Sequence, residues 1–260
     1  MVIHWNQSYN SAGETIEISG HVISSKDEFF AYLSKDFPEV IENYQGIKSA
    51  QDILSNLTQT GFQSSVLKEE LLNEEIRMSD WGEFFAYHQL EVHYQISIPW
   101  PSQWDKKKDT HSLPGTDIVG LKHDGETISF VFGEVKTSQE SRFPPRVVNK
   151  ENDGLIAQIK RFGDKKIIYG LIKWLLLKSK GQTWESDFKR ALEYYGQNDN
   201  CFSSVGVLIR DTEPTINDLL CSIGMLEVEF KVSFYAFYIP ISIDECIEIS
   251  TRGGVAHVGS

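Results

Sequence analysis

The sequence predicts an α/β fold in which helices flank a central mixed sheet. Runs of alternating apolar and polar residues, typical of strands, lie between segments with helical periodicity. These segments follow the order helix, strands, helices, strand, helix, strand, which is typical of a sheet covered by helices. The length of 260 residues fits one large domain, or one core with a modest addition.

The composition indicates a folded protein of an intracellular kind. Hydrophobic residues make up 40% of the chain and charged residues 24%, which excludes a mainly disordered chain. No apolar run approaches the roughly 18 residues that a membrane span needs, so no membrane partner is expected. The chain start lacks the features of a secretory signal, and the 3 cysteines form no CxxC pair. We therefore expect a cytoplasmic protein.

The first third of the chain alternates strand and helix signals. Residues 15–23 alternate as a strand does, and Ser25-Lys26-Asp27-Glu28 resembles a capping box at the start of a helix. Either Ser79 or Asp80 is expected to cap another helix that runs to Leu90. Two more short helices are expected at residues 47–57 and 66–76.

Two strands joined by a tight turn follow in the middle of the chain. The first covers residues 117–121 and the second residues 127–136, with the turn at His123-Asp124-Gly125. The remaining elements are expected as helices at 154–162, 166–178, 184–195 and 216–223, and as strands at 204–209 and 232–238.

Acidic and basic side chains meet within the two strands of this hairpin. Glu134 and Lys136 are two residues apart in one strand, so they point to the same face. Asp117 begins the preceding strand and can lie across from Glu134. Two adjacent carboxylates repel each other unless a cation compensates them, and Mg²⁺ binds carboxylates while keeping waters and accepting phosphate oxygens. Two carboxylates, a metal and a lysine suit the hydrolysis of a phosphodiester.

The segment Pro114-Gly115-Thr116-Asp117, followed by Glu134-Val135-Lys136, resembles the PD-(D/E)xK nuclease superfamily. The resemblance covers roughly residues 79–240 by element order and implies a restriction-endonuclease-like core. It also implies that Glu83, on the preceding helix, assists Asp117 and Glu134 in binding Mg²⁺, with Mn²⁺ as a substitute. Gln158 resembles the polar residue often found on the helix after the ExK motif. Two residues, Gly and Thr, separate Pro from Asp here, which departs from the adjacent pair of the motif.

A narrower resemblance concerns the same two strands with their flanks. Residues 113–121 and 133–138 look like the nuclease subunit of Hachiman-type bacterial antiphage systems. That resemblance implies DNA cleavage restrained until invasion is sensed, in association with a helicase encoded beside the nuclease. It implies DNA and a helicase-like subunit as partners.

The resemblance also divides the chain into two parts. Residues 76–260 are expected to form the nuclease domain. Residues 1–75 are expected to be an N-terminal α/β elaboration that serves partner docking or restraint, because aromatic residues such as Trp5, Phe29 and Tyr32 often anchor interfaces.

The charge is distributed unevenly along the chain. The net charge is −12, but residues 136–190 hold 13 basic and 6 acidic side chains. This basic segment directly follows the ExK motif, where local positive charge would hold a polyanion. The acidic flanks predict weak intrinsic DNA affinity, which a DNA-tracking partner would supplement.

Other readings of these patterns stay open at this point. The ExK could be an exposed ion pair of little consequence, Glu83 could favour its helix through the dipole alone, and Gln158 could be solvated. The fold could also serve as a catalytically silent regulatory or scaffolding subunit, or as an RNA-directed nuclease. No nucleotide-binding or serine-hydrolase motif is present, so those chemistries have no support in the sequence.

Overall fold

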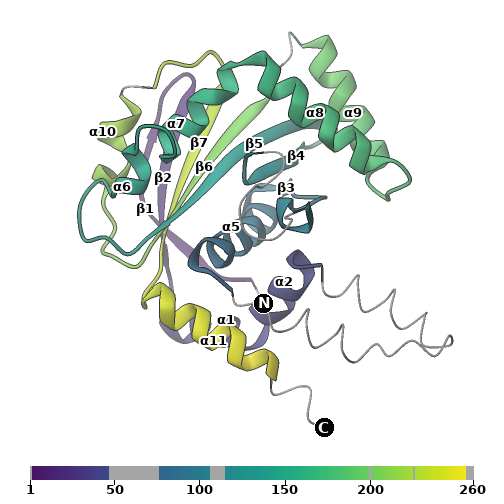
Figure 1. The fold of residues 1–260 in the computed structure, drawn as a ribbon. Coiled ribbons are helices and arrows are strands. Elements are labelled where there is room, and N and C mark those ends of the chain that lie inside the picture. The colour runs from purple at the N-terminus through teal and green to yellow at the C-terminus, as the bar shows by residue number, and fades with distance from the viewer. Residues whose placement is uncertain (1, 47–75, 106–114, 199–200, 225, 256–260) are drawn as a thin grey trace, which may run out of the picture.

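The computed structural model describes residues 2–46, 76–105, 115–198, 201–224 and 226–255. Within these ranges seven strands form one mixed sheet in the order β1-β2-β7-β6-β5-β4-β3 (Figure 1). The strands are β1 (Trp5–Ala12), β2 (Ile16–Ile23), β3 (Ile96–Ser97), β4 (Ile118–Asp124), β5 (Thr127–Ser138), β6 (Ser203–Arg210) and β7 (Lys231–Tyr238). The four inner strands β2, β7, β6 and β5 are parallel, and antiparallel strands flank them on both sides.

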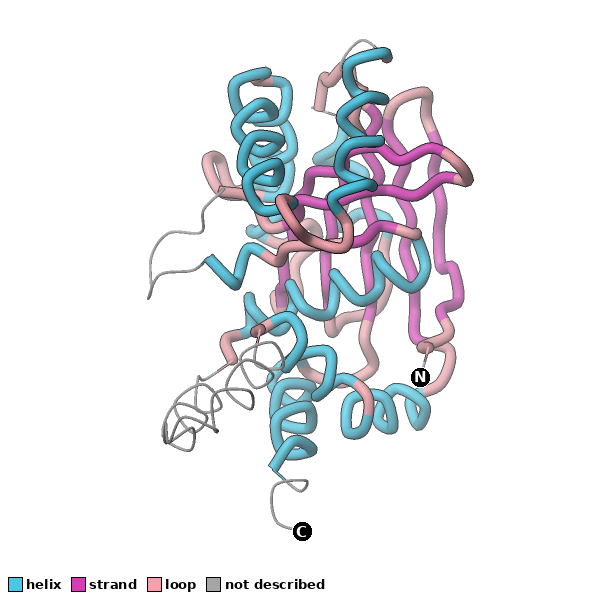
Figure 2. The backbone as a smooth tube through the Cα atoms, turned by 90° about the vertical axis from the view of Figure 1, so that its right-hand side faces the viewer, coloured by secondary structure: helices cyan, strands magenta, loops and turns pink. Residues whose placement is uncertain are grey.

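Helices cover both faces of this sheet, so the α/β prediction with a central mixed sheet is confirmed (Figures 1 and 2). One face carries α1 (Lys26–Lys35), α2 (Phe37–Tyr44), α5 (Met78–Tyr94) and α11 (Ile243–Val255). The other carries α6 (Arg146–Asn149), α7 (Leu155–Lys160), α8 (Lys165–Ser179), α9 (Glu185–Gln197) and α10 (Leu220–Ile223). Short 3₁₀ turns lie at η2 (Ser102–Asp105), η3 (Arg161–Gly163) and η4 (Ile216–Asp218). None of the described helices combines the length and apolar character needed to cross a bilayer.

Each face of the sheet has its own apolar core. Along β5, Val131 and Val135 pack with the helices α1, α2, α5 and α11, whereas Phe130 and Phe132 pack with α7, α8 and α9. Alternate residues of a strand point to opposite faces. Glu134 therefore shares the face of Phe130 and Phe132, toward α7.

Most of the expected elements form, with corrections at their ends. Ser25 caps α1 as predicted, because its hydroxyl accepts the backbone N–H of Glu28. The helix predicted through Leu90 forms as α5, but its predicted cap was wrong: α5 begins at Met78 without a side-chain cap, and Asp80 forms an ion pair with Arg77. The hairpin turn consists of Gly125 and Glu126 and lies later than expected, because β4 extends to Asp124 while β5 begins at Thr127 as predicted. The helices expected at 47–57 and 66–76 lie outside the described residues.

The hairpin of β1 and β2 belongs to the same sheet as the rest of the chain. β2 runs parallel to β7, with Ile16 beside Val232. Phe29 and Tyr32, expected as interface aromatics, are instead fully buried in the core beside α5 and α11. Docking by residues 1–75 stays a prediction, and a test of it should use surface substitutions, because deleting the whole segment would remove two strands and part of a core.

Helix α5 approaches β5 closely at a glycine. A Cβ atom at Gly82 would lie 2.0 Å from Thr137 Oγ1 and 3.2 Å from Thr137 Cβ. Both distances are shorter than van der Waals contact, so the absence of a side chain lets the helix lie against the strand. This contact sets the distance between α5 and the part of β5 that follows Glu134.

We expect Gly82→Ala to destabilise the protein by about 1 kcal/mol or more, because overpacking outweighs the gain in helix propensity. Gly170→Ala in α8 is the matched control, since its Cβ would meet nothing within 4 Å. That control should be neutral or stabilising. Urea denaturation measures both, and adding Thr137→Ala should recover part of the loss in Gly82→Ala. Equal stability of the two alanine variants would contradict the close-contact explanation.

Candidate active site

The site forms where β4 begins and β5 runs on beyond it. The register pairs Ile118 with Gly133, so the last residues of β5 have no partner from β4. At this point the Asp117 carboxylate accepts the backbone N–H of Val135 at 2.9 Å, in place of a strand carbonyl. The Thr116 hydroxyl donates to the Gly133 carbonyl at 2.5 Å. These two bonds hold Asp117 against β5, opposite Glu134 as the sequence predicts.

Glu134 and Lys136 project together from β5 toward α7. Lys136 Nζ lies 2.8 Å from Glu134 Oε1, and the Glu134 residue is only 5% exposed. The second carboxylate oxygen, Oε2, is buried and accepts no hydrogen bond from the described residues. A buried oxygen without a donor is costly, which is typical of a position where a ligand completes the coordination.

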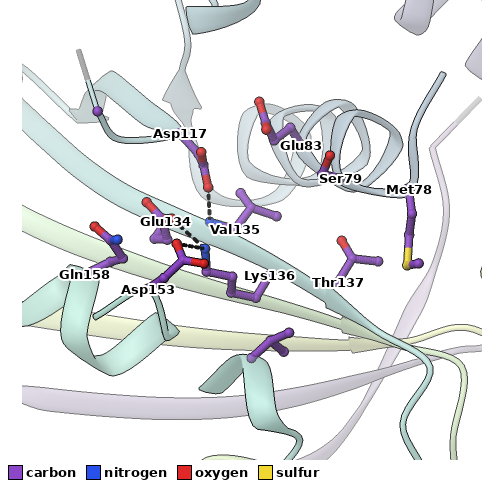
Figure 3. Close-up of a pocket in the computed structure, with 12 residues that line it drawn as sticks. Met78, Ser79, Glu83, Asp117, Glu134, Val135, Lys136, Thr137, Asp153 and Gln158 are labelled. Carbon is purple, nitrogen blue, oxygen red and sulfur yellow. Dashed lines mark hydrogen bonds and ion pairs between the residues drawn. The ribbon is translucent and has the colours of Figure 1, made fainter. Parts of the chain in front are cut away.

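A pocket of about 480 Å³ brings the predicted residues together (Figure 3). Glu83, Asp117, Glu134, Lys136 and Gln158 all line it. The other lining residues are Met78, Ser79, Gly115, Val135, Thr137, Val147 and Asp153. Four of the lining side chains are carboxylates and one is a lysine, so the pocket favours a bound cation.

Glu83 enters the pocket from α5, on the opposite face of the sheet from α7. Its Oε2 accepts hydrogen bonds from Gln103 Nε2 at 2.6 Å and from the Tyr87 hydroxyl at 3.3 Å. The same Tyr87 hydroxyl lies 2.6 Å from the Asp117 carbonyl and so ties α5 to the start of β4. Within the described ranges, no three His, Cys, Asp or Glu side chains converge as a metal site. The role of Glu83 as a metal ligand stays a prediction.

Gln158 reaches the pocket from α7 and is held by its own neighbours. Its amide donates to the Asn152 carbonyl at 3.3 Å, and Arg161 donates to its amide oxygen. Gly115, with φ of +80°, lies on the same rim, where an added Cβ would be 3.9 Å from the Arg161 guanidinium. Gln158 therefore holds the positively charged Arg161 guanidinium at the mouth of the pocket.

Two further residues of the site were missed at the sequence level. The Asp153 carboxylate lies 3.6 Å from Lys136 Nζ and 3.0 Å from Lys150 Nζ. It therefore interacts with both of these lysines. Its position in Asn-Asp-Gly, just before α7 and about one turn before Gln158, was an available signal. Tyr87 is the second, four residues after Glu83 on one helix face.

The environment of Glu134 disfavours its charge. Burial, together with repulsion from the neighbouring Asp117 carboxylate, raises the pKa of Glu134 to about 8 although Lys136 opposes the change. Burial lowers the pKa of Lys136, but the Glu134 carboxylate outweighs this effect and holds the lysine pKa above its usual value. Without a cation, the site therefore favours the charged Lys136 ammonium and disfavours the Glu134 carboxylate charge beside Asp117.

The donor set fits a hard divalent cation. Mg²⁺ is commonly bound by one or two carboxylates, with waters and phosphate oxygens completing its shell. Asp117 and Glu134 are the residues that would hold it, and the uncompensated Glu134 Oε2 is the oxygen that gains a partner. A cation would also relieve the repulsion that raises the Glu134 pKa.

A family model described as HamA matches residues 6–247, which is most of the chain. The matched range includes the whole pocket and all of the β1–β2 hairpin except Trp5. No curated protein matches the chain.

We expect Glu134→Gln to flatten the pH dependence of stability in metal-free protein. The folded-state pKa of Glu134 is raised to about 8 from its ordinary value of 4.5. Its contribution is therefore fully present below pH 4.5 and is lost as the pH rises to 8. The free energy of unfolding of the parent should fall across this window by an amount on the order of 1–3 kcal/mol beyond that of the variant.

Urea denaturation in EDTA at several pH values measures this difference. Glu193→Gln, which changes an exposed carboxylate on α9, should keep the parental slope. A parental slope in Glu134→Gln would show that Glu134 does not retain its proton at neutral pH.

Proposed function

Because this chain belongs to the HamA family of Hachiman-type antiphage defence, we propose that it is a metal-dependent DNA nuclease that acts with a helicase subunit. The observation that carries the proposal is the pairing of Glu134 with Lys136 beside Asp117, with one Glu134 oxygen buried and unsatisfied. A purely structural role does not require these three residue types together in one pocket. The arrangement supports a PD-(D/E)xK assignment for the core.

We propose Mg²⁺ as the cofactor, with Mn²⁺ as a substitute, held by Asp117 and Glu134. Bound there, the ion would supply Lewis-acid polarisation of a phosphodiester and activation of a water nucleophile. Val135 keeps Asp117 in place through its backbone N–H, so the carboxylate is positioned before any ligand arrives. Such preorganisation avoids rearrangement during the reaction.

Lys136 acts in this proposal as a cation and hydrogen-bond donor. Its pKa is held above the ordinary value by Glu134, so it does not serve as a general base at neutral pH. From β5 its ammonium reaches Glu134 Oε1 at 2.8 Å and Asp153 Oδ1 at 3.6 Å. It can orient the attacking water or stabilise the developing charge on the phosphate.

The surroundings of the pocket favour a polyanionic substrate. Lys160, Arg161, Lys165 and Lys166 are all exposed around the end of α7 and the start of α8. Arg161 reaches the pocket rim through its contact with Gln158. The rest of the chain is acidic, which supports the need for a separate subunit that holds the DNA.

We expect Asp117→Asn and Glu134→Gln each to abolish metal-dependent nicking of supercoiled plasmid while leaving the protein folded. The asparagine oxygen can still accept the Val135 N–H, so the loss would be one of metal binding. Added Mg²⁺ should raise the melting temperature of the parent more than that of either variant, because a ligand of the native state stabilises it by mass action.

Lys136→Met separates catalysis from metal binding. At pH 8.5, where Glu134 ionises more readily, most of the Mg²⁺-induced stabilisation should persist, while the cleavage rate falls on the order of 10²-fold or more. Lys173→Met, an exposed lysine on α8, is the matched control. Near-parental cleavage by Lys136→Met would overturn the catalytic assignment and favour a scaffolding subunit. Parallel assays on RNA distinguish the two nucleic acids.

We expect charge reversal at Lys160, Arg161, Lys165 and Lys166 to weaken DNA binding and to flatten its dependence on salt. Each phosphate contact that is lost removes released counterions, so the slope of log K against log salt should decrease by roughly 0.9 per duplex contact. Thermal stability should change little because these side chains are exposed. Fluorescence anisotropy at several salt concentrations gives the slope, and an unchanged slope would place the DNA elsewhere.

A further inference from the structure

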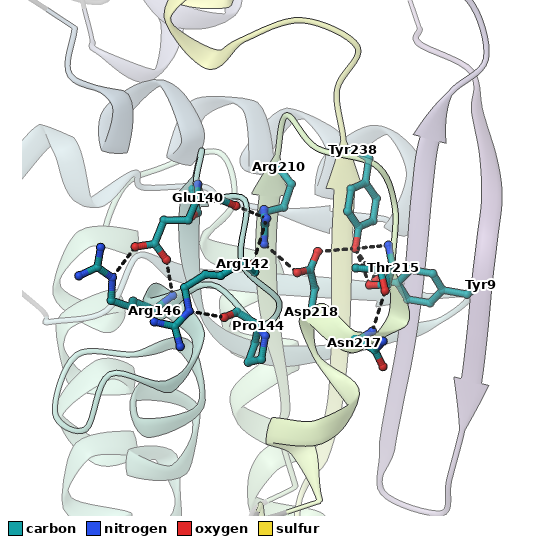
Figure 4. A network of polar contacts seen from close by, with 11 residues as sticks. Tyr9, Glu140, Arg142, Pro144, Arg146, Arg210, Thr215, Asn217, Asp218 and Tyr238 are labelled. Carbon is teal, nitrogen blue, oxygen red and sulfur yellow. Dashed lines mark hydrogen bonds and ion pairs between the residues drawn. The ribbon is translucent and has the colours of Figure 1, made fainter.

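The last residue of β6 fixes the loop that follows β5. Arg210 is fully buried, and its Nη1 lies 2.7 Å from Asp218 Oδ1. Its Nη2 donates to the backbone carbonyls of Glu140 and Arg142, in the loop of residues 139–145 (Figure 4). A buried charge is costly unless hydrogen bonds satisfy it, so these carbonyls are strongly held.

The partner of Arg210 is held in turn by two tyrosines. The Tyr238 hydroxyl lies 2.8 Å from Asp218 Oδ2, and the Tyr9 hydroxyl lies 2.9 Å from that of Tyr238 (Figure 4). The polar network thus runs from β1 through β7 and β6 to the loop. It gives the loop after β5 a defined conformation although its outer side chains face solvent.

This loop presents an exposed aromatic ring. Phe143 is 49% exposed, although phenylalanine is among the residues most often fully buried. The Arg210 guanidinium lies 5.5 Å from its ring centroid, a cation–π distance. Phe143 is therefore supported from inside the protein while about half of its surface stays open to solvent.

Basic side chains and two pocket-lining residues lie close to Phe143 in the sequence. Arg142 and Arg146 flank Phe143 in sequence and are exposed. The loop follows Ser138 and precedes Arg146, and the next residue outward on each side, Thr137 and Val147, lines the pocket. The one acidic residue of the loop, Glu140, is engaged by the backbone and side chain of Arg146.

We propose that residues 139–146 form a stacking platform for an unpaired base of single-stranded DNA entering the pocket. Proteins that bind single strands combine basic side chains for phosphates with aromatic rings on which bases stack. Phe143 supplies the ring here, and Arg142 supplies the cation. The bases of an intact duplex are stacked on each other, so the platform favours unpaired strands. This inference rests on the proposed nuclease function, since it names the substrate of the same pocket.

The test compares binding of single-stranded and duplex DNA without any metal. Fluorescence anisotropy with a labelled mixed-sequence 20-mer in EDTA and low salt reports affinity independently of cleavage. Phe143→Leu keeps an apolar side chain but removes the aromatic face, and should weaken single-strand binding about tenfold, with a much smaller effect on blunt duplex. Phe143→Trp should restore or strengthen binding. Tyr169→Leu, which changes an equally exposed ring on α8, should have no effect.

A second measurement uses the unmodified protein, so it does not depend on how a variant folds. Iododeoxyuridine-substituted single strands, crosslinked by light to the parent chain, should attach to the peptide that contains Phe143. The proposal is overturned if the parent does not bind single strands, if Phe143→Leu binds as the parent does, if single strands and duplex lose affinity equally, or if the crosslink maps elsewhere. Absence of cleavage with intact Phe143-dependent binding would instead contradict the nuclease proposal alone.

Discussion

Val135 donates its backbone N–H to the Asp117 carboxylate where β4 begins and β5 continues past it. A strand that outruns its neighbour would otherwise leave this N–H unpaired in a largely buried place, at a cost of about 1–3 kcal/mol. The Asp117 side chain supplies the missing acceptor, and the same side chain places a second carboxylate beside Glu134. The geometry of the sheet and the geometry of the site therefore depend on the same hydrogen bond.

The pocket joins the two layers of helices through the end of one strand. Glu83 and Tyr87 come from α5, whereas Gln158 and Asp153 come from α7 or the turn before it. Tyr87 contacts both Glu83 and the backbone of Asp117, so a shift of α5 changes both carboxylates at once. The buried, partly uncompensated Glu134 makes this region less stable than a packed core would be. Such a trade of stability for chemistry is common at functional sites.

The sequence was sufficient for those parts of the site that depend on local geometry. Glu134 and Lys136 share a face because the period of a strand is two, and the short turn of the hairpin brings Asp117 opposite Glu134. The position of Glu83 was harder to predict, because it depends on the packing of α5 against β5 at Gly82. Strand β1 was missed because its exposed residues outnumber its partly buried ones, so no alternating apolar pattern marks it. Asp153 was missed because the path of the loop before α7 depends on tertiary contacts.

The parallel pairing of β2 with β7 has a consequence for synthesis on the ribosome. Ile16 lies beside Val232. The β1–β2 hairpin therefore cannot pair with β7 until nearly the whole chain has been synthesised. Arg210, which holds the loop after β5, is also made long after that loop. A nascent chain emerges from its N-terminus onward, and contacts of such long range form late in folding. An interrupted translation product therefore carries the carboxylates and the lysine but lacks the strands that order their surroundings.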